Sequence, residues 1–179
     1  MKKIAFASLL AIASFAASAQ YVSVDVDHVK TKAGHESSAQ YVRAGKNIGG
    51  IDFGLQSRTG VGNQGGMFNS LEVTAGGKLG AIKPFVGVGY DNGFNGAPNG
   101  SYTYGLLGAT TGAKVGPGFA LAGVKTRVGT SADHETKQTV AFGTYSIPVT
   151  KGIALNLNAS KSYQDIKETA FGVGLGFNF

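Results

Sequence analysis

Apolar and polar residues alternate along most of the chain after residue 20, with a period of two. In the stretch YVSVDVDH, a valine occupies every second position, and Ser23, Asp25 and Asp27 stand between the valines. The stretch AFGVGLGFNF follows the same rule, with glycines and Asn178 between its apolar residues. A period of two places the apolar residues on one face of a strand and the polar residues on the other. The pattern therefore predicts β-strands and not amphipathic helices.

Ten segments are expected to be strands, because they show this period or carry strand-forming residues between turn signals. They are residues 20–29, 38–46, 49–58, 67–79, 83–91, 101–115, 118–130, 137–148, 152–163 and 167–179. Longer polar connections such as DNGFNGAPNG alternate with short ones such as KVGPG. The alternation is weak in 101–115 and 137–148, so the faces of these two strands stay open. Eight strands is the alternative count.

Two architectures produce alternation of this kind. A soluble sandwich buries its apolar face in a core, whereas an outer-membrane barrel turns its apolar face to lipid and its polar face to the lumen. Long charged side chains such as Arg43, Glu72 and Arg127 lie at mid-strand on the polar face, and the apolar face of the clear strands carries no charge there. The apolar face also contains many alanines, which would pack a soluble core poorly. The sequence predicts an all-β fold, a closed antiparallel transmembrane β-barrel.

The first 19 residues do not follow the strand pattern. They read MKKIAFASLLAIASFAASA, with Lys2 and Lys3 first, then a short apolar stretch, then Ala17-Ser18-Ala19. This order is typical of a secretory signal peptide, and the apolar stretch is too short for a membrane-spanning helix. We expect residues 1–19 to be cleaved and residues 20–179 to form one barrel domain in an exported protein.

Composition narrows the possible functions further. The chain has no cysteine, which excludes disulfide bonds and thiolate metal sites. Its 16 basic residues exceed its 10 acidic ones, for a net charge of +6 that includes two leader lysines. An excess of this size could suggest nucleic acid, but an exported chain is not expected to meet it. We expect no nucleic-acid partner and no cofactor.

The leader, the alternating hairpins and the terminal FGVGLGFNF together resemble the small porin-like outer-membrane β-barrel superfamily of Gram-negative bacteria. The resemblance covers the whole mature chain and is specific for architecture, not for activity. It implies an outer-membrane location and a last strand that carries the signal read by the barrel-assembly machinery during insertion. The residues that would form this signal are Phe171, Val173, Leu175, Phe177 and Phe179. The last strand should also pair with the first, because an open edge in lipid leaves backbone groups unpaired.

The charged residues of the inward face are the first candidates for function. They are Asp25, Asp27, Arg43, Asp52, Glu72, Lys125 and Arg127. They either fill the lumen as cross-strand ion pairs or line a narrow, water-filled pore that selects solutes by charge. Inward glycines on the fifth strand (Gly87, Gly89) and tenth strand (Gly172, Gly174, Gly176) leave either a slot or a space that Arg127 closes. The expected function is a structural protein or a narrow passive porin with a charged lumen.

Basic residues near the outer ends of strands are the second candidates. They are Lys30, Lys32, Arg58, Lys137, Lys161 and Lys167. Such a rim would suit the phosphates of lipopolysaccharide, or it would simply keep the loop ends soluble. The alternative function is therefore a surface interaction protein that binds lipopolysaccharide or host ligands through its short extracellular loops.

Histidines near the loops, His28, His35 and His134, raise the question of catalysis or metal binding. Adjacent strand residues point to opposite faces, so Asp27 and His28 cannot face one cleft. A metal site would require the first and fourth loops to touch, which their short length opposes. We expect no catalytic activity and no metal, and a monomer whose partners are outer-membrane lipid and lipopolysaccharide.

Overall fold

The computed structural model describes residues 19–32, 34, 36–62, 67–92, 101–130, 135–165 and 167–179. Within them the chain forms ten strands. These are β1 (Tyr21–Thr31), β2 (Glu36–Ile48), β3 (Ile51–Gly62), β4 (Met67–Gly77), β5 (Ile82–Asn92), β6 (Ser101–Val115), β7 (Gly118–Thr130), β8 (Glu135–Thr150), β9 (Ile153–Gln164) and β10 (Glu168–Asn178). The bounds of β6 and β7 agree with the sequence prediction, and those of the other strands differ by at most four residues at either end.

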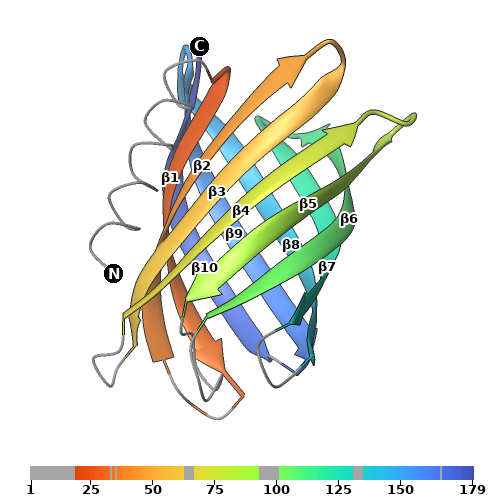
Figure 1. Ribbon diagram of the computed structural model, residues 1–179. Coiled ribbons are helices and arrows are strands. Elements are labelled where there is room, and N and C mark those ends of the chain that lie inside the picture. Colours follow the sequence, from red (N-terminus) through yellow and green to blue (C-terminus); the bar gives the residue numbers. More distant parts are fainter. Residues whose placement is uncertain are drawn as a thin grey trace.

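The strands close into a barrel in which each strand pairs with its neighbours in sequence, and β1 pairs with β10 (Figure 1). The closing register runs antiparallel from Tyr21 opposite Asn178 to Thr31 opposite Glu168. Closure gives the backbone groups of both terminal strands a partner, as a lipid environment requires. The closed antiparallel barrel is confirmed, with ten strands and not eight.

Tight turns join the strands at one end of the barrel. Gly49, Gly50, Gly80, Gly116 and Gly152 lie in these turns with positive φ angles, a conformation that glycine adopts without the steric cost of a Cβ. The other end carries the longer connections, parts of which lie outside the described residues. Outer-membrane barrels have short periplasmic turns and longer extracellular loops. We therefore refer to the end with the glycine turns as the inner end and to the opposite end as the outer end.

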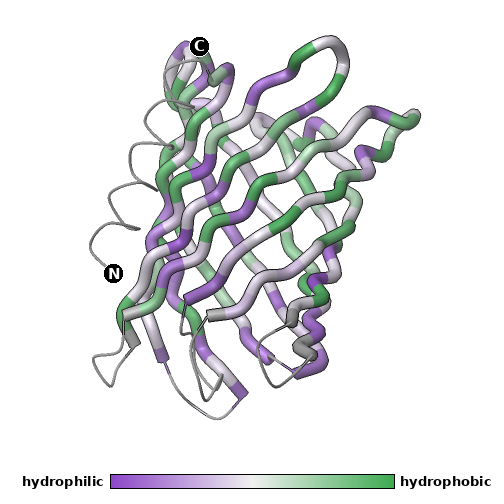
Figure 2. The backbone as a smooth tube through the Cα atoms, in the orientation of Figure 1, coloured by the Kyte–Doolittle hydropathy of each residue, from purple (hydrophilic) through white to green (hydrophobic). Residues whose placement is uncertain are grey.

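Side chains alternate between the inside and the outside of the barrel, and Figure 2 shows how hydrophilic and hydrophobic residues alternate along the strands. In β1, Asp25 and Asp27 are buried inside, whereas Val24 and Val26 are about half exposed on the outer surface. The two strands with weak alternation follow the same rule. Tyr104 of β6 is buried inside, and Gln138 of β8 lies opposite the inward Arg127. Even-numbered residues therefore face the lumen in both strands.

Aromatic rings cover inward glycines of neighbouring strands. A Cβ added to Gly60 would collide with the Phe68 ring, and one added to Gly89 would collide with the Tyr104 ring. Rings that lean over glycines are a known means of stabilising the register of curved sheets. The absence of a Cβ at these glycines therefore makes room for an aromatic ring from the neighbouring strand.

The predicted leader lies outside the described residues except for Ala19, so its cleavage stays a prediction. Within the part of the chain that the structure describes, no helix has the length and apolar character needed to cross a membrane.

Candidate functional site

One group of paired charges in the lumen is the Glu72 cluster, which consists of Glu72, Tyr104, Lys125, Arg127 and Gln138. Lys125 Nζ donates to Glu72 Oε1 at 2.6 Å, and Arg127 donates to Glu72 Oε2 through Nη2 at 2.7 Å and Nε at 3.2 Å. The Tyr104 hydroxyl also donates to Oε2, at 3.3 Å. Arg127 Nη1 donates to Gln138 Oε1 at 3.0 Å. One carboxylate thus binds two cations.

The cluster spans two intervening strands. Glu72 lies on β4 and both cations lie on β7, with β5 and β6 between them. The positions opposite Glu72 on β5 and opposite Lys125 on β6 are Gly89 and Gly108. Because these positions have no side chain, the Tyr104 ring can lie over Gly89 and the ion pairs can reach across the inner wall.

The charged side chains of the Glu72 cluster are more buried than side chains that line a wide water channel would be. The side chains of Glu72, Lys125 and Arg127 are 6%, 11% and 13% exposed. Charges that lined an open channel would contact water over much more of their surface. Mutual pairing replaces the lost hydration here, which is the condition under which buried charges are tolerated.

A second group, the Asp25 cluster, lies on the other side of the lumen and consists of Ser23, Asp25, Arg43, Asn156 and Asn158. Asp25 Oδ2 accepts hydrogen bonds from Arg43 Nη1 and, at 2.8 Å, from Ser23 Oγ. Asp25 Oδ1 accepts from Asn158 Nδ2 at 2.9 Å and Asn156 Nδ2 at 3.4 Å. Asp25 is almost completely buried, whereas the Arg43 side chain is 28% exposed.

The Asp25 cluster also reaches across a strand of glycines. Asp25 is on β1 and the two asparagines are on β9, with β10 between them. A Cβ at Gly174 would collide with Asp25, and a Cβ at Gly172 would collide with the Asp27 carboxylate. Side chains of neighbouring strands lie over three of the five inward glycines, Gly89, Gly172 and Gly174. Whether a slot remains between the two glycine-bearing strands across the lumen stays a prediction.

Arg58 is not on the exposed rim where the sequence analysis placed it. Its side chain is 8% exposed, and Nη2 lies 3.7 Å from Glu168 Oε2. The guanidinium also stacks over the rings of Phe68 and Tyr41, at 4.8 and 5.6 Å from their centroids. Arg58 shares its strand face with the inward Gln56, so it points into the outer half of the lumen.

Two of the predicted inward acids lie outside both clusters. Asp52 is at the inner end, where it accepts from Asn47 Nδ2 at 2.7 Å and Lys83 Nζ at 3.0 Å with 41% of its side chain exposed. Asp27 is buried over Gly172, and its Oδ1 accepts no hydrogen bond from the described residues. The seven predicted lumen charges therefore form two buried clusters and an exposed pair at the inner end, and Asp27 is buried apart from them.

Five of the six predicted rim residues are exposed. They are Lys30, Lys32, Lys137, Lys161 and Lys167. They lie on or next to β8, β9, β10 and β1, which are consecutive in the barrel. Lys30 pairs with Glu36 at 3.2 Å, and the Lys161 ammonium lies 5.7 Å from the centre of the Tyr163 ring.

The alternate residues of the predicted assembly signal lie on the outer surface. Phe171, Val173, Leu175 and Phe179 are exposed, and Phe177 is partly exposed. Their recognition by the assembly machinery stays a prediction.

The histidine candidates form no site in the described chain. His28 points outward, with Nε2 3.9 Å from Glu36 Oε2. His35, Asp133 and His134 lie outside the described residues. Among those that are described, no three histidine or acidic side chains come together as metal ligands would.

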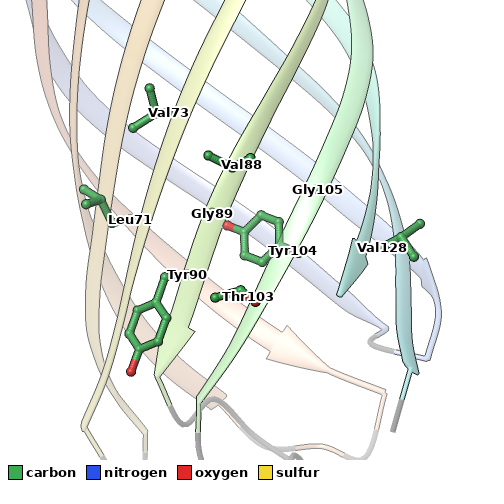
Figure 3. A pocket seen from close by; sticks show the side chains of 9 residues that line it. All are labelled: Leu71, Val73, Val88, Gly89, Tyr90, Thr103, Tyr104, Gly105 and Val128. Carbon is green, nitrogen blue, oxygen red and sulfur yellow. The ribbon is translucent and has the colours of Figure 1, made fainter. Parts of the chain in front are cut away.

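A groove of about 470 Å³ lies on the lipid-facing surface over β4 to β7, and we call it the outer groove (Figure 3). Its lining consists of Leu71, Val73, Val88, Gly89, Tyr90, Thr103, Tyr104, Gly105 and Val128. Gly105 forms its floor, since a Cβ there would meet no atom within 4 Å. Sequence reasoning missed the groove because strand 101–115 had no assigned face. The two valines that flank Gly105 belong to neighbouring strands, so nothing in the sequence alone indicated the groove.

No model of a known protein family matches the chain, and a comparison with curated proteins finds no match either. Solved structures do resemble it. The β-domain of the Bordetella autotransporter BrkA is 11% identical with a TM-score of 0.53, over 89% of this chain and 98% of that one. The translocator domain of the autotransporter NalP from Neisseria meningitidis is 11% identical with a TM-score of 0.51, over 99% and 98%.

The KdgM porin is 14% identical with a TM-score of 0.49, over 88% of this chain and 99% of that one. Identities this low carry no information about activity. The two likenesses with TM-scores above 0.5, together with the closed ten-stranded barrel, show that the chain has the fold of outer-membrane β-barrels.

Proposed function

We propose that this protein is a small structural β-barrel of the outer membrane, exported with a cleaved leader, whose lumen is held closed at mid-depth. It acts as a monomer and carries out no chemical step. The observation that carries the proposal is the Glu72 cluster, in which a carboxylate and two cations from strands three apart are bound to one another and largely shielded from water.

The Asp25 cluster supports the same proposal from the other side of the lumen. Asp25 uses both of its oxygens on partners from β1, β2 and β9. A carboxylate with all of its acceptor sites engaged has little capacity to bind a passing ion. The two clusters thus act as cross-braces between strands, a role that suits a barrel filled by side chains.

Conductance across a planar lipid bilayer tests this proposal. The folded wild-type protein is expected to give no stable current steps. A variant with Glu72→Ala, Lys125→Ala and Arg127→Ala removes the cross-brace and should conduct in discrete steps. The matched control, Asp52→Ala with Lys83→Ala, removes the ion pair at the inner end and should stay silent.

The rival outcome is a narrow passive porin. Stable steps from the wild-type protein, with an ion preference that changes when Lys125 and Arg127 are replaced by glutamine, would establish that the clusters line a conducting path. A folded triple variant that stays silent would equally contradict closure by the Glu72 cluster.

A second candidate function is the binding of lipopolysaccharide at the cell surface. The observation that favours it is the grouping of five exposed lysines on four consecutive strands. Lysines close to a membrane surface each attract anionic lipid by about 1 kcal/mol. A variant with glutamine at Lys30, Lys161 and Lys167 should bind lipopolysaccharide more weakly at low salt than the wild type does. Equal affinity would remove this candidate and leave the lumen proposal untouched.

A further inference from the structure

The outer groove continues into a row of directly paired residues that ends at a rim lysine. Val73 pairs with Val88, Val88 with Gly105, Gly105 with Val128, and Val128 with Lys137. All five belong to the outward face, so they form one continuous line across β4, β5, β6, β7 and β8. With strand spacings of about 4.8 Å, this line is roughly 19 Å long.

The line climbs toward the outer end as it crosses the strands. Val73 is the seventh residue of β4 counted from the outer end, whereas Lys137 is the third residue of β8. Figure 3 shows the same course from Val73 past Val88 to Val128, toward the end that carries the longer connections. A molecule lying along the line would have one end deep in the membrane and the other near the outer surface.

The chemistry changes along the line in the same direction. The line itself begins with apolar positions, three valines around the bare Gly105 floor. Tyr90 and Thr103, which pair with each other one row nearer the outer end, present hydroxyl-bearing side chains. Lys137 at the end of the line is exposed and adds a positive charge. An apolar line that ends at a cation, with hydroxyl groups in the row beside it on the outer side, matches an acyl chain joined to a polar, negatively charged headgroup.

We propose that the outer groove binds one acyl chain of lipid A, the phosphorylated lipid of lipopolysaccharide, and that Lys137 binds a phosphate of its headgroup. The choice of lipid A follows from position, because the cationic end of the line lies at the outer end, where the outer leaflet is. Asp165 is nearby, but its carboxylate accepts a hydrogen bond from the Lys137 backbone nitrogen at 2.7 Å. The proposal deepens the second candidate function and does not depend on whether the lumen is closed.

The absence of a side chain at Gly105 is what lets an acyl chain lie in the outer groove. Between apolar surfaces in lipid there is no hydrophobic driving force, so specific binding rests on close van der Waals packing. Replacement of Gly105 by leucine would fill the floor from outside. Since the added Cβ meets no protein atom within 4 Å, the barrel itself has no reason to change.

The test measures the affinity of the folded, purified barrel for bis-phosphorylated lipid A by native mass spectrometry. Gly105→Leu and Lys137→Gln should each weaken binding about fivefold. The matched control for the first is Gly143→Leu, because Gly143 is another outward glycine whose added Cβ makes only ordinary contact with Leu121 O at 3.4 Å. The control should keep wild-type affinity. Heat-modifiable migration in gels confirms that every variant is folded.

A double variant distinguishes binding of lipid A in the outer groove from a general electrostatic attraction of lipid A to the rim lysines. If the acyl chain in the groove positions the phosphate at Lys137, then Lys137→Gln should reduce lipid A affinity much less in the Gly105→Leu variant than in the wild type. Lys161→Gln should retain its full effect in that background, because Lys161 lies on β9, away from the groove. Unchanged affinity of Gly105→Leu, or full additivity of Gly105→Leu with Lys137→Gln, would overturn the proposal while leaving rim binding intact. Equal affinity for phosphatidylglycerol would overturn lipid A as the occupant.

Discussion

The two carboxylates at the middle of the lumen, Glu72 and Asp25, are used differently although both reach across glycine-bearing strands. Glu72 binds two cations that are almost as buried as it is. Asp25 binds one arginine that is 28% exposed, and its remaining partners are a hydroxyl and two amides. Loss of Glu72 should therefore leave two buried cations without a counter-ion. Loss of Asp25 should leave one cation that is partly hydrated. The stability lost when either carboxylate is removed therefore depends on whether its former partners can find other hydrogen bonds or water.

The largest effect is expected for Glu72→Gln. Breaking a buried ion pair by removing one partner typically costs about 3–5 kcal/mol, because the remaining charge stays buried without compensation. Here both Lys125 and Arg127 lose their counter-ion. Urea-induced unfolding from lipid vesicles, followed by circular dichroism, should show a loss of this size.

The matching rescue sharpens this prediction. A triple variant with Glu72→Gln, Lys125→Met and Arg127→Met removes every charge of the cluster and should recover most of the lost stability. If the triple variant were less stable than Glu72→Gln alone, unpaired charge would not be the cause of the loss.

Asp25→Asn should cost less, about 2 kcal/mol, which is the range for hydrogen bonds to a charged group. Arg43 keeps its hydrogen bond to Gln56 Oε1 at 2.9 Å and its place 4.5 Å from the centre of the Tyr41 ring. It also keeps part of its hydration. Urea-induced unfolding again measures the loss of stability. A loss equal to that of Glu72→Gln would show that the two carboxylates contribute alike to stability, whatever the burial of their partners.

The glycines beneath the two clusters should also differ. A Cβ at Gly174 would collide with the backbone carbonyl of Val24 and with Asp25, whereas the nearest atoms to a Cβ at Gly89 all belong to the Tyr104 ring. A ring can turn aside, but a strand backbone cannot. Within the usual 1–3 kcal/mol cost of overpacking, Gly174→Ala should lie near the upper end and Gly89→Ala near about 1 kcal/mol. Similar losses in both would show that the Tyr104 ring is as fixed as the backbone.

The sequence predicted the barrel well because the period of two is a local property that lipid and lumen enforce on every strand. It placed Lys125 and Arg127 on the inward face and the C-terminal apolar residues on the outward face. It could not pair Glu72 with Lys125, because residues 53 positions apart meet only through the register of the strands between them. The burial of Arg58 could not be predicted for a related reason. The alternation places Arg58 on the inward face near the outer end of its strand, but the burial of its side chain follows from Tyr41, Phe68 and Glu168 on other strands.

The smallest effect is expected for Asp52→Asn, which serves as the baseline for both clusters. Asp52 makes the same kind of bond as Glu72, to Lys83 at 3.0 Å, but 41% of its side chain and 54% of that of Lys83 are exposed. Exposed pairs contribute about 0.2–1 kcal/mol at most, and salt screens them. Unfolding at low salt should therefore show a loss of at most about 0.5 kcal/mol, and 0.5 M NaCl should remove it. A loss from Asp52→Asn that persisted at high salt would mean that the ion pair itself, and not burial, sets the stability of this lumen.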